Sequence, residues 1–202
     1  LQYGANGAMT IAPGLYTNLT YDPARDFAPI SQLLAIGSIV AVHNSLPTKS
    51  MKELVALAKT DPGQLSYASP GAGTPQHIGF ELIKILARAN ITHVPYKGAV
   101  ITDVLGGRVP MTMQNAAAIL PTVRAGRLRG LAQTSHKPSP NIPEFPTVAE
   151  SGFPGFEVTS WFGLFAPAGT PPAVVGKLHQ DVGEVLAQPD LRARVAQLGH
   201  DT

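Results

Sequence analysis

Short strand-like runs alternate with segments of helical periodicity along most of this chain. The sequence predicts strands at 36–42, 65–69, 91–94, 109–114 and 128–133, and helices at 51–61, 75–86, 101–105, 116–125, 147–150, 171–185 and 190–198. This alternation indicates an α/β fold, with mostly parallel sheets that carry helices on both faces. Ligands bind beyond the carboxyl ends of strands in such sheets, so the loops at those ends are the candidate sites.

The segment from Tyr67 to His77 combines a strand end, a turn of small residues and a helix start. Thr74 suits the N-cap of that helix, and Pro75 suits its first position. The apolar positions of the helix are Ile78, Leu82, Ile83 and Leu86. This spacing favours a helix whose N-terminus lies directly after the turn.

A turn of this kind directs backbone N–H groups towards one point, together with the hydroxyls of Ser69 and Thr74. A helix N-terminus carries partial positive charge, so this point favours a carboxylate or a phosphate. The alternative interpretation is that Gly71 and Gly73 only make the turn tight.

Polar residues also follow other predicted strands. Tyr96 and Lys97 offer a hydroxyl and a cation, and Gln114 and Asn115 offer neutral amides. Each pair either recognises a ligand through hydrogen bonds or caps a loop. Near the start, Gly4-Ala5-Asn6-Gly7 is interpreted as a turn, which either presents backbone amides to a ligand or is an ordinary Asn-Gly turn.

The composition excludes several classes of protein. The net charge of +2 is too small for a nucleic-acid-binding surface. The absence of cysteine excludes thiol catalysis and disulfides, and the scattered histidines lack metal-binding spacing, so we expect no metal or other cofactor. No apolar run approaches the roughly 20 residues of a membrane span. Residues 1–4 show no signal peptide, so we expect a mature or truncated product.

Catalytic motifs are weak in this sequence. Ser69 and His77 are the candidates for a hydrolase, but no Gly-x-Ser-x-Gly elbow surrounds Ser69. His77 falls in the first turn of a predicted helix, where a structural role is favoured. We therefore expect a binding protein rather than an enzyme, with a Ser/His hydrolase as the less favoured alternative.

Five stretches, in order along the chain, resemble one known family. They are Leu19-Thr20-Tyr21-Asp22-Pro23-Ala24-Arg25-Asp26-Phe27-Ala28-Pro29, Tyr67 to Thr74, His93-Val94-Pro95-Tyr96-Lys97-Gly98, Phe145 to Gly152, and Thr159 to Pro171. The chain resembles the Bug/TctC type of extracytoplasmic solute-binding protein, which serves tripartite tricarboxylate transporters. The matches run across nearly the whole chain.

The resemblance implies a two-lobed periplasmic-binding-protein fold (type II-like), here without the N-terminal part of lobe 1. Lobe 1 would comprise residues 1–43 and 157–202, and lobe 2 residues 44–156. The lobes would close on a ligand through a hinge near 43–44 and 156–161. The chain also stops short of the family's last helical segment and is shorter than usual between Lys97-Gly98 and Thr102-Asp103.

The same resemblance implies a ligand-binding set drawn from both lobes. In lobe 2, Ser69, Gly71, Gly73 and Thr74 would hold a carboxylate, Tyr96 would contribute a contact, and Gln114 and Asn115 would select the ligand. From lobe 1, Asn6, Gly7, Phe162 and Gly163 would face it.

The function implied is capture of a small organic carboxylate, such as a dicarboxylate, a tricarboxylate or an aromatic acid. The partners would be the membrane permease subunits of a tripartite tricarboxylate transporter, the location the periplasm, and the protein a monomer. The alternative is a ligand-sensing module that reports to a membrane signalling partner.

Overall fold

The chain divides into two compact units in its computed structural model, which describes residues 1–197. Unit 1 comprises residues 1–36 and the chain from 160 onwards, and unit 2 comprises residues 37–159. The sequence-based boundaries were 43–44 and 156–157. Leu198, at which the last helix was predicted to end, lies outside the described residues.

Unit 2 is built on a mixed sheet with the strand order β6-β2-β5-β3-β4. Its strands are the second part of β2 (Phe27–His43), β3 (Ser66–Ser69), β4 (Thr92–Pro95), β5 (Met111–Asn115) and β6 (Leu128–Gln133). β3 pairs in parallel with β4 and β5, whereas β2 runs antiparallel to β5 and β6. The predicted parallel arrangement thus holds for β4, β3 and β5, whose carboxyl ends lie at one edge.

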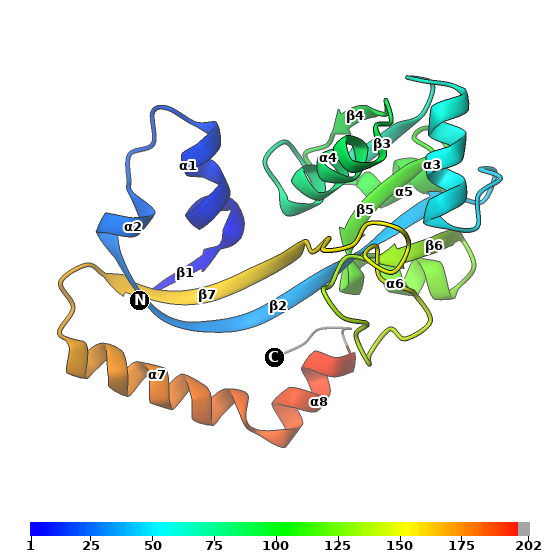
Figure 1. The fold of residues 1–202 in the computed structure, drawn as a ribbon. Coiled ribbons are helices and arrows are strands. Elements are labelled where there is room, and N and C mark those ends of the chain that lie inside the picture. Colours follow the sequence, from blue (N-terminus) through cyan, green and yellow to red (C-terminus); the bar gives the residue numbers. More distant parts are fainter. Residues whose placement is uncertain (198–202) are drawn as a thin grey trace. The chain divides into compact units, whose positions relative to one another are not determined.

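Helices cover both faces of this sheet, as predicted (Figure 1). They are α3 (Met51–Thr60), α4 (Pro75–Ala87), α5 (Val100–Leu105) and α6 (Ala116–Arg124). Val40 and Val42 of β2 pack in a buried cluster with α3 and α4. Ile39 and Ala41 belong to a second cluster with α5 and α6. Alternate residues of one strand therefore serve opposite faces.

Helix α4 buries a different stripe from the one that the sequence suggested. Ile83 is buried as expected, but Ile78 and Leu86 are exposed. The buried positions are Gln76, Gly79, Phe80, Ile83 and Ala87. The helix is therefore rotated so that Phe80 packs on the sheet.

The predicted short helix at 147–150 is wrong, although its capping hydrogen bonds are present. Thr147 Oγ1 accepts from the Glu150 N–H (3.0 Å), and a Glu150 carboxylate oxygen accepts from the Thr147 N–H (2.8 Å). The backbone that follows is a turn instead of a helix. Both ends of a capping box can therefore stabilise a single turn.

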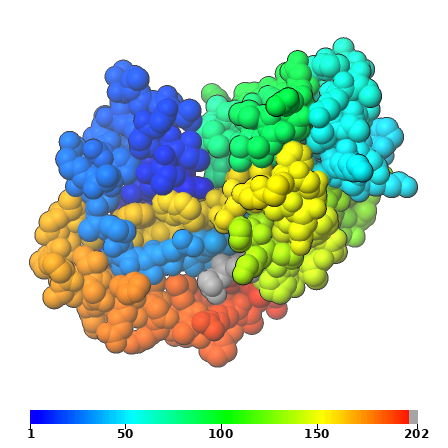
Figure 2. All heavy atoms as spheres, viewed as in Figure 1, coloured from blue at the N-terminus to red at the C-terminus, as the bar shows by residue number. Residues whose placement is uncertain are grey.

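Unit 1 contains β1 (Gln2–Ala5), β7 (Thr159–Pro167) and the first part of β2. β1 runs antiparallel to β7, and β7 lies beside β2. Its helices are the π-helix η1 (Gly7–Ile11), α1 (Ala12–Leu15), α2 (Pro23–Asp26), α7 (Pro172–Leu186) and α8 (Pro189–Gln197). In Figure 2, α7 and α8 form a layer of orange to red atoms at the surface of this unit.

Two boundaries in unit 1 differ from prediction. β2 begins at Phe27 instead of residue 36. The first nine residues of this strand were missed because the run 27–35 mixes polar and apolar residues without clear alternation. Helix α7 begins at Pro172 instead of residue 171, with Pro171 as its N-cap, and the Thr170 hydroxyl donates to the Pro167 carbonyl at 2.8 Å.

The Tyr21-to-Phe27 signature makes a compact corner in unit 1. Asp22 caps α2 by accepting from the N–H groups of Ala24 and Arg25. The Tyr21 hydroxyl donates to the Ala8 carbonyl of η1 at 2.8 Å, and the Tyr21 ring meets Phe27 edge-on at 6.3 Å. The signature therefore fixes the path of the chain between η1 and β2.

Candidate functional site

The loop between β3 and α4 in unit 2 is closed by its own hydrogen bonds. Ser69 is fully buried at the carboxyl end of β3, and its hydroxyl accepts from the Gly71 N–H at 3.2 Å. Thr74 caps α4: its hydroxyl accepts from the His77 N–H (3.3 Å) and donates to the Gly71 carbonyl (2.8 Å). The predicted N-cap is therefore confirmed, and both hydroxyls meet the backbone of Gly71.

Two glycines give the loop its shape. Gly71 has φ +144° and Gly73 has φ +77°, a region that other residues rarely adopt. The Gly73 N–H donates to Nδ1 of His77 at 3.1 Å, and the Thr74 N–H donates to the Gly71 carbonyl at 3.4 Å. Within residues 1–197, the Ala72 N–H has no hydrogen-bond partner, and Ala72 is exposed. The loop therefore presents one unused amide to solvent.

Four rings stack behind this loop. The His77 and His93 rings are 4.1 Å apart, His93 and Tyr67 4.8 Å, and Tyr67 and Phe80 4.0 Å between centroids. Nε2 of His93 lies 2.7 Å from the Ser69 hydroxyl. The stack joins β4, β3 and α4, so it fixes the loop from inside the unit.

The charges beside the stack are paired with one another. The Lys84 ammonium contacts both carboxylate oxygens of Glu81 at 2.7 and 2.8 Å, and the Tyr67 hydroxyl donates to Glu81 at 2.8 Å. Burial acts to raise the pKa of Glu81, but hydrogen bonds from Lys84 and Tyr67 outweigh it and lower this pKa. Burial raises the pKa of Tyr67, and Glu81 adds to the effect. Glu81 is thus an ionised acceptor.

Gln114 and Asn115 end β5 at the same edge of the sheet. The Gln114 side chain donates to the Thr112 hydroxyl at 3.1 Å. The buried Gln76 side chain of α4 donates to the Asn115 side chain and to the Ser38 hydroxyl, the latter at 3.4 Å. Asn115 therefore links β5 to α4 and β2, while Gln114 lines a pocket.

That pocket lies at the carboxyl edge of unit 2 and has a volume of about 420 Å³. It is lined by Pro70, Gln114 and the residues Lys97 to Thr102. The three predicted strand ends, after β3, β4 and β5, thus contribute to one hollow. A volume of this order suits a small molecule.

Tyr96 is placed differently from the pocket-lining residues. Its hydroxyl donates to the Asp103 carboxylate at 2.9 Å, and Arg108 pairs with the other oxygen of Asp103. Burial raises the pKa of Tyr96, and Asp103 adds to this. The hydroxyl is therefore held within unit 2, whereas the neighbouring Lys97 is exposed at the pocket.

The predicted turn over Gly4 to Gly7 in unit 1 is wrong, since Gly4 and Ala5 belong to β1. Asn6 has helical dihedral angles (φ −54°, ψ −33°), and the chain passes from β1 directly into η1 and α1. The Thr10 hydroxyl donates to the Asn6 carbonyl at 2.8 Å. Asn6 and Gly7 therefore begin a helix, at a strand end that resembles the junction after β3.

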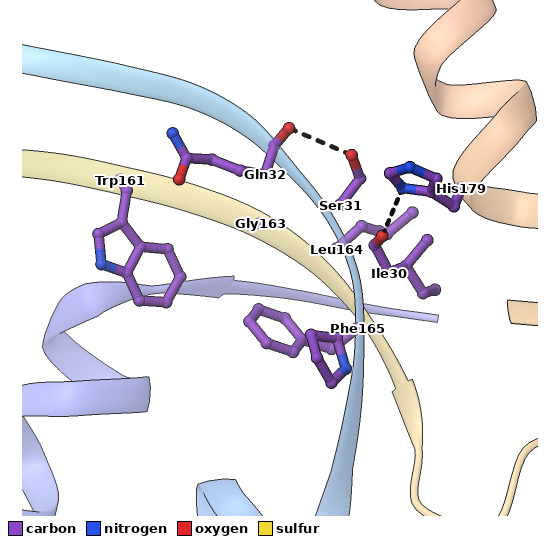
Figure 3. Close-up of a pocket in the computed structure, with 9 residues that line it drawn as sticks. Ile30, Ser31, Gln32, Trp161, Gly163, Leu164, Phe165 and His179 are labelled. Carbon is purple, nitrogen blue, oxygen red and sulfur yellow. Dashed lines mark hydrogen bonds between the residues drawn. The ribbon is translucent and has the colours of Figure 1, made fainter. Parts of the chain in front are cut away.

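Phe162 and Gly163 lie on β7 and point to opposite faces. Phe162 stacks on Tyr3 of β1 at 5.6 Å. Gly163 pairs with Gly4 and allows the Phe165 ring to lie over both glycines, since a Cβ at either position would meet that ring. Gly163 also lines a pocket of about 510 Å³ within unit 1, with Trp161, Phe165 and His179 (Figure 3).

The structure does not assemble the suggested hydrolase pair. The Ser69 hydroxyl bonds His93 instead of His77, and Ser69 has no exposed surface. The Ser69–His93 contact was missed because the two residues lie 24 apart in sequence.

Among residues 1–197, no group of three or more His, Asp or Glu side chains could hold a metal ion. In that same part of the chain, no helix is long and apolar enough to cross a membrane.

These features define an α/β protein of two units, in which one unit has a small pocket at the carboxyl edge of its mixed sheet, lined by mostly apolar residues together with Lys97, Thr102 and Gln114. The chain belongs to the TctC family, described as "Tripartite tricarboxylate transporter family receptor", whose model matches residues 1–202. The resemblance drawn from the five sequence stretches is thereby confirmed.

Curated relatives support this assignment. The chain is 31% identical to the protein BugT of Bordetella pertussis, over 90% of this chain and 56% of the relative. It is 36% identical to a UPF0065 protein of Pseudomonas sp. strain P51, over 93% of this chain and 56% of the relative. The chain thus spans about half the length of the curated relatives it matches.

Solved structures confirm the fold class. The R. palustris protein Rpa4515 with adipate matches with a TM-score of 0.89 at 34% identity, over 98% of this chain and 67% of that one. MatC from Rhodopseudomonas palustris with bound malate matches with a TM-score of 0.83 at 30% identity, over 98% of this chain and 68% of that one. The fold is therefore the α/β fold of the Bug/TctC periplasmic binding proteins.

Proposed function

We propose that this chain binds a small organic carboxylate in the periplasm and delivers it to the membrane permease subunits of a tripartite tricarboxylate transporter. The observation that carries the proposal is the pocket of unit 2, where Gln114, Pro70 and Lys97 from three strand ends line one hollow. Relatives solved with adipate and with malate support the class of ligand. The receptor acts without catalysis and as a single chain.

The chemistry of the pocket suits a carboxylate. Gln114 supplies a neutral amide, Lys97 an exposed cation, and the nearby loop the unused Ala72 N–H. Each hydrogen bond to a charged carboxylate contributes about 1.5–3 kcal/mol. Most of these donors are neutral, so the affinity depends only weakly on salt. That Asn6, Gly7, Phe162 and Gly163 of unit 1 share in binding stays a prediction.

A thermal-shift screen against adipate, malate, citrate and benzoate tests the proposal. A ligand that binds only the folded state raises the unfolding temperature, in proportion to RT ln(1 + [L]/Kd). We expect at least one of these acids to stabilise the protein and to be recovered chemically unchanged. If none shifts the transition, the chain does not bind this class of ligand.

Charge reversal at the pocket tests its location. Lys97→Glu removes an exposed cation and adds a negative charge beside the bound carboxylate. An interaction between unit charges is worth about 1 kcal/mol at 4 Å in water, so exchanging an attraction for a repulsion costs about 2 kcal/mol, and we expect Kd for the selected acid to rise by roughly thirtyfold. Lys59→Glu, at an exposed site of α3, is the matched control and leaves Kd unchanged. Equal affinities for both variants would place the site elsewhere.

A further inference from the structure

The amide of Gln114 is held in one orientation at the pocket of unit 2. Its Nε2 group donates to the Thr112 hydroxyl at 3.1 Å. That hydroxyl has a single proton, which it donates to the Ala68 carbonyl at 2.7 Å, with a longer contact of 3.5 Å to the Met113 carbonyl. Carbonyl oxygens only accept, so the proton is directed to them and the hydroxyl accepts from Gln114. The nitrogen of the Gln114 amide therefore faces Thr112.

The oxygen of the same amide is left for a ligand. Within residues 1–197, Oε1 of Gln114 has no hydrogen-bond partner. In that part of the chain, Thr48 Oγ1 is the only side-chain N or O atom that is both enclosed and without a partner, so Oε1 of Gln114 keeps accessible surface. Gln114 is only 7% exposed, and it lines the pocket. Its oxygen therefore opens into the pocket as a hydrogen-bond acceptor.

Lys97 supplies the charge of this pocket. Among the described residues that line it, Lys97 alone is charged, and none is an aspartate or a glutamate. The Lys97 side chain is exposed and forms no ion pair within residues 1–197. A ligand carboxylate is attracted by this cation, whereas a ligand ammonium is repelled by it and finds no lining carboxylate.

We propose that this pocket selects a hydroxycarboxylate, whose carboxylate pairs with Lys97 and whose hydroxyl donates to Oε1 of Gln114. This inference rests on the proposed function and names the class of acid. A ligand that enters the pocket displaces water from Oε1. A hydroxyl restores the lost hydrogen bond, whereas a methylene group at the same position leaves the acceptor unpaired. A hydroxy acid is therefore bound more tightly than the same acid without its hydroxyl.

Isothermal titration calorimetry of the full chain with succinate, L-malate and D-malate tests this inference. Malate is succinate with one added hydroxyl, and near pH 7.5 the carboxylates of both acids are ionised. We expect the tighter-binding malate enantiomer to have a Kd about tenfold lower than that of succinate. L-Aspartate carries an ammonium in place of the hydroxyl and is expected to bind more weakly than malate. Succinate or aspartate that binds as tightly as malate overturns the inference.

Gln114→Met tests the acceptor itself, because methionine has a similar length and no amide oxygen. We expect this variant to raise the Kd for malate about tenfold and to leave the Kd for succinate nearly unchanged. Gln64→Met is the matched control, since Gln64 is exposed in the turn before β3, at the opposite end of that strand from Pro70. It keeps the preference of wild type for malate. Retention of that preference in Gln114→Met contradicts the inference.

Lys97→Met separates the two contacts. It removes the cation that attracts the carboxylate of either acid, so both Kd values rise by a similar factor and the preference for malate remains. The ligand series in wild type stands even if Gln114→Met fails to fold, because it needs no variant. If malate and succinate bind equally, or if only acids without a hydroxyl bind, this inference fails and the proposed function stands. If no carboxylate binds, both fail.

Discussion

The two units of this chain differ sharply in how much apolar surface they bury. Both hydrophobic clusters lie in unit 2, where helices cover each face of the sheet. The buried apolar residues of unit 1, within the described residues, are Ala12, Ile30, Ile36, Ala166 and Val195. Helix α7 has no buried residue along its 15 positions. Apolar burial is the main stabilising contribution to folding, so unit 2 is the more stable unit.

The candidate site residues follow this difference. In unit 2, Ser69 is fully buried and Gln114 is 7% exposed, so the loop rests on a packed interior. In unit 1, Phe162 stacks on Tyr3, which is 57% exposed. A site is held accurately when its supporting residues are fixed by packing. The candidate residues of unit 2 therefore rest on a packed support, whereas those of unit 1 lie on a more adaptable surface.

Hydrogen exchange gives the largest expected contrast. Amides of β5 in the centre of unit 2 exchange through unfolding of that unit, whereas amides of β1 at the edge of unit 1 exchange through local opening. We expect protection factors in β5 (Met111–Asn115) to exceed those in β1 (Gln2–Ala5) by at least about two orders of magnitude, since about 1.4 kcal/mol is a factor of ten. Mass spectrometry of peptides from each strand measures this ratio. Equal protection would show that the two units unfold as one.

Truncation of one aromatic residue in each unit gives the next largest effect. Phe80 is fully buried beneath the Tyr67 ring, so Phe80→Ala leaves a cavity and lowers the free energy of unfolding by about 3–5 kcal/mol. Phe162→Ala removes a partly exposed stack and costs about 1 kcal/mol. Urea unfolding followed by far-UV circular dichroism measures both.

The only tryptophan of the chain separates the units in that experiment, because Trp161 belongs to unit 1. We expect Phe80→Ala to move the circular-dichroism transition more than the fluorescence transition of Trp161. A larger loss of stability from Phe162→Ala than from Phe80→Ala would contradict the assignment of the main core to unit 2.

Local signals in the sequence predicted the elements of unit 2 well. Thr74 caps α4 as predicted and Ser50 caps α3 in the same way, because each offers a short side-chain oxygen to the N–H three residues on. The alternation of strands and helices also predicted helices on both faces of the sheet. These signals act over a few residues, so they can be read without knowledge of the fold.

Contacts between distant segments could not be predicted in this way. The pairing of Ser69 with His93 depends on β4 lying beside β3 in parallel register, where Ser69 is opposite Pro95. Likewise, Asn6–Gly7 has the composition of a turn, yet it continues as helix from β1 into η1. The direction of β2 also depends on the whole sheet, since antiparallel pairing with β5 and β6 leaves no local mark.

Alanine at two glycines compares the two strand-to-helix junctions directly. Gly73 has φ +77°, so Gly73→Ala is strained and destabilises the protein by about 1 kcal/mol or more. Gly7 lies within η1, and a Cβ there meets no atom within 4 Å. Gly7→Ala is therefore expected to stabilise by up to about 1 kcal/mol. Thermal unfolding of both variants measures the opposite signs, and stabilisation by Gly73→Ala would contradict the left-handed conformation of the loop.

Acidification gives the smallest effect, and it acts on unit 2. Burial lowers the pKa of His93 in the folded protein, whereas an unfolded histidine titrates near pH 6.5. The unfolded state therefore binds more protons than the folded state below about pH 6.5, and stability falls as pH drops through that value towards the folded pKa.

His93→Gln retains a polar group beside the Ser69 hydroxyl but cannot be protonated. We expect the unfolding temperature of wild type to fall between about pH 7.5 and 5.5, and that of His93→Gln to fall less. His136→Gln, at an exposed loop position, should follow wild type. If His93→Gln shows the same pH dependence as wild type, the histidine stack does not couple protonation to the stability of unit 2.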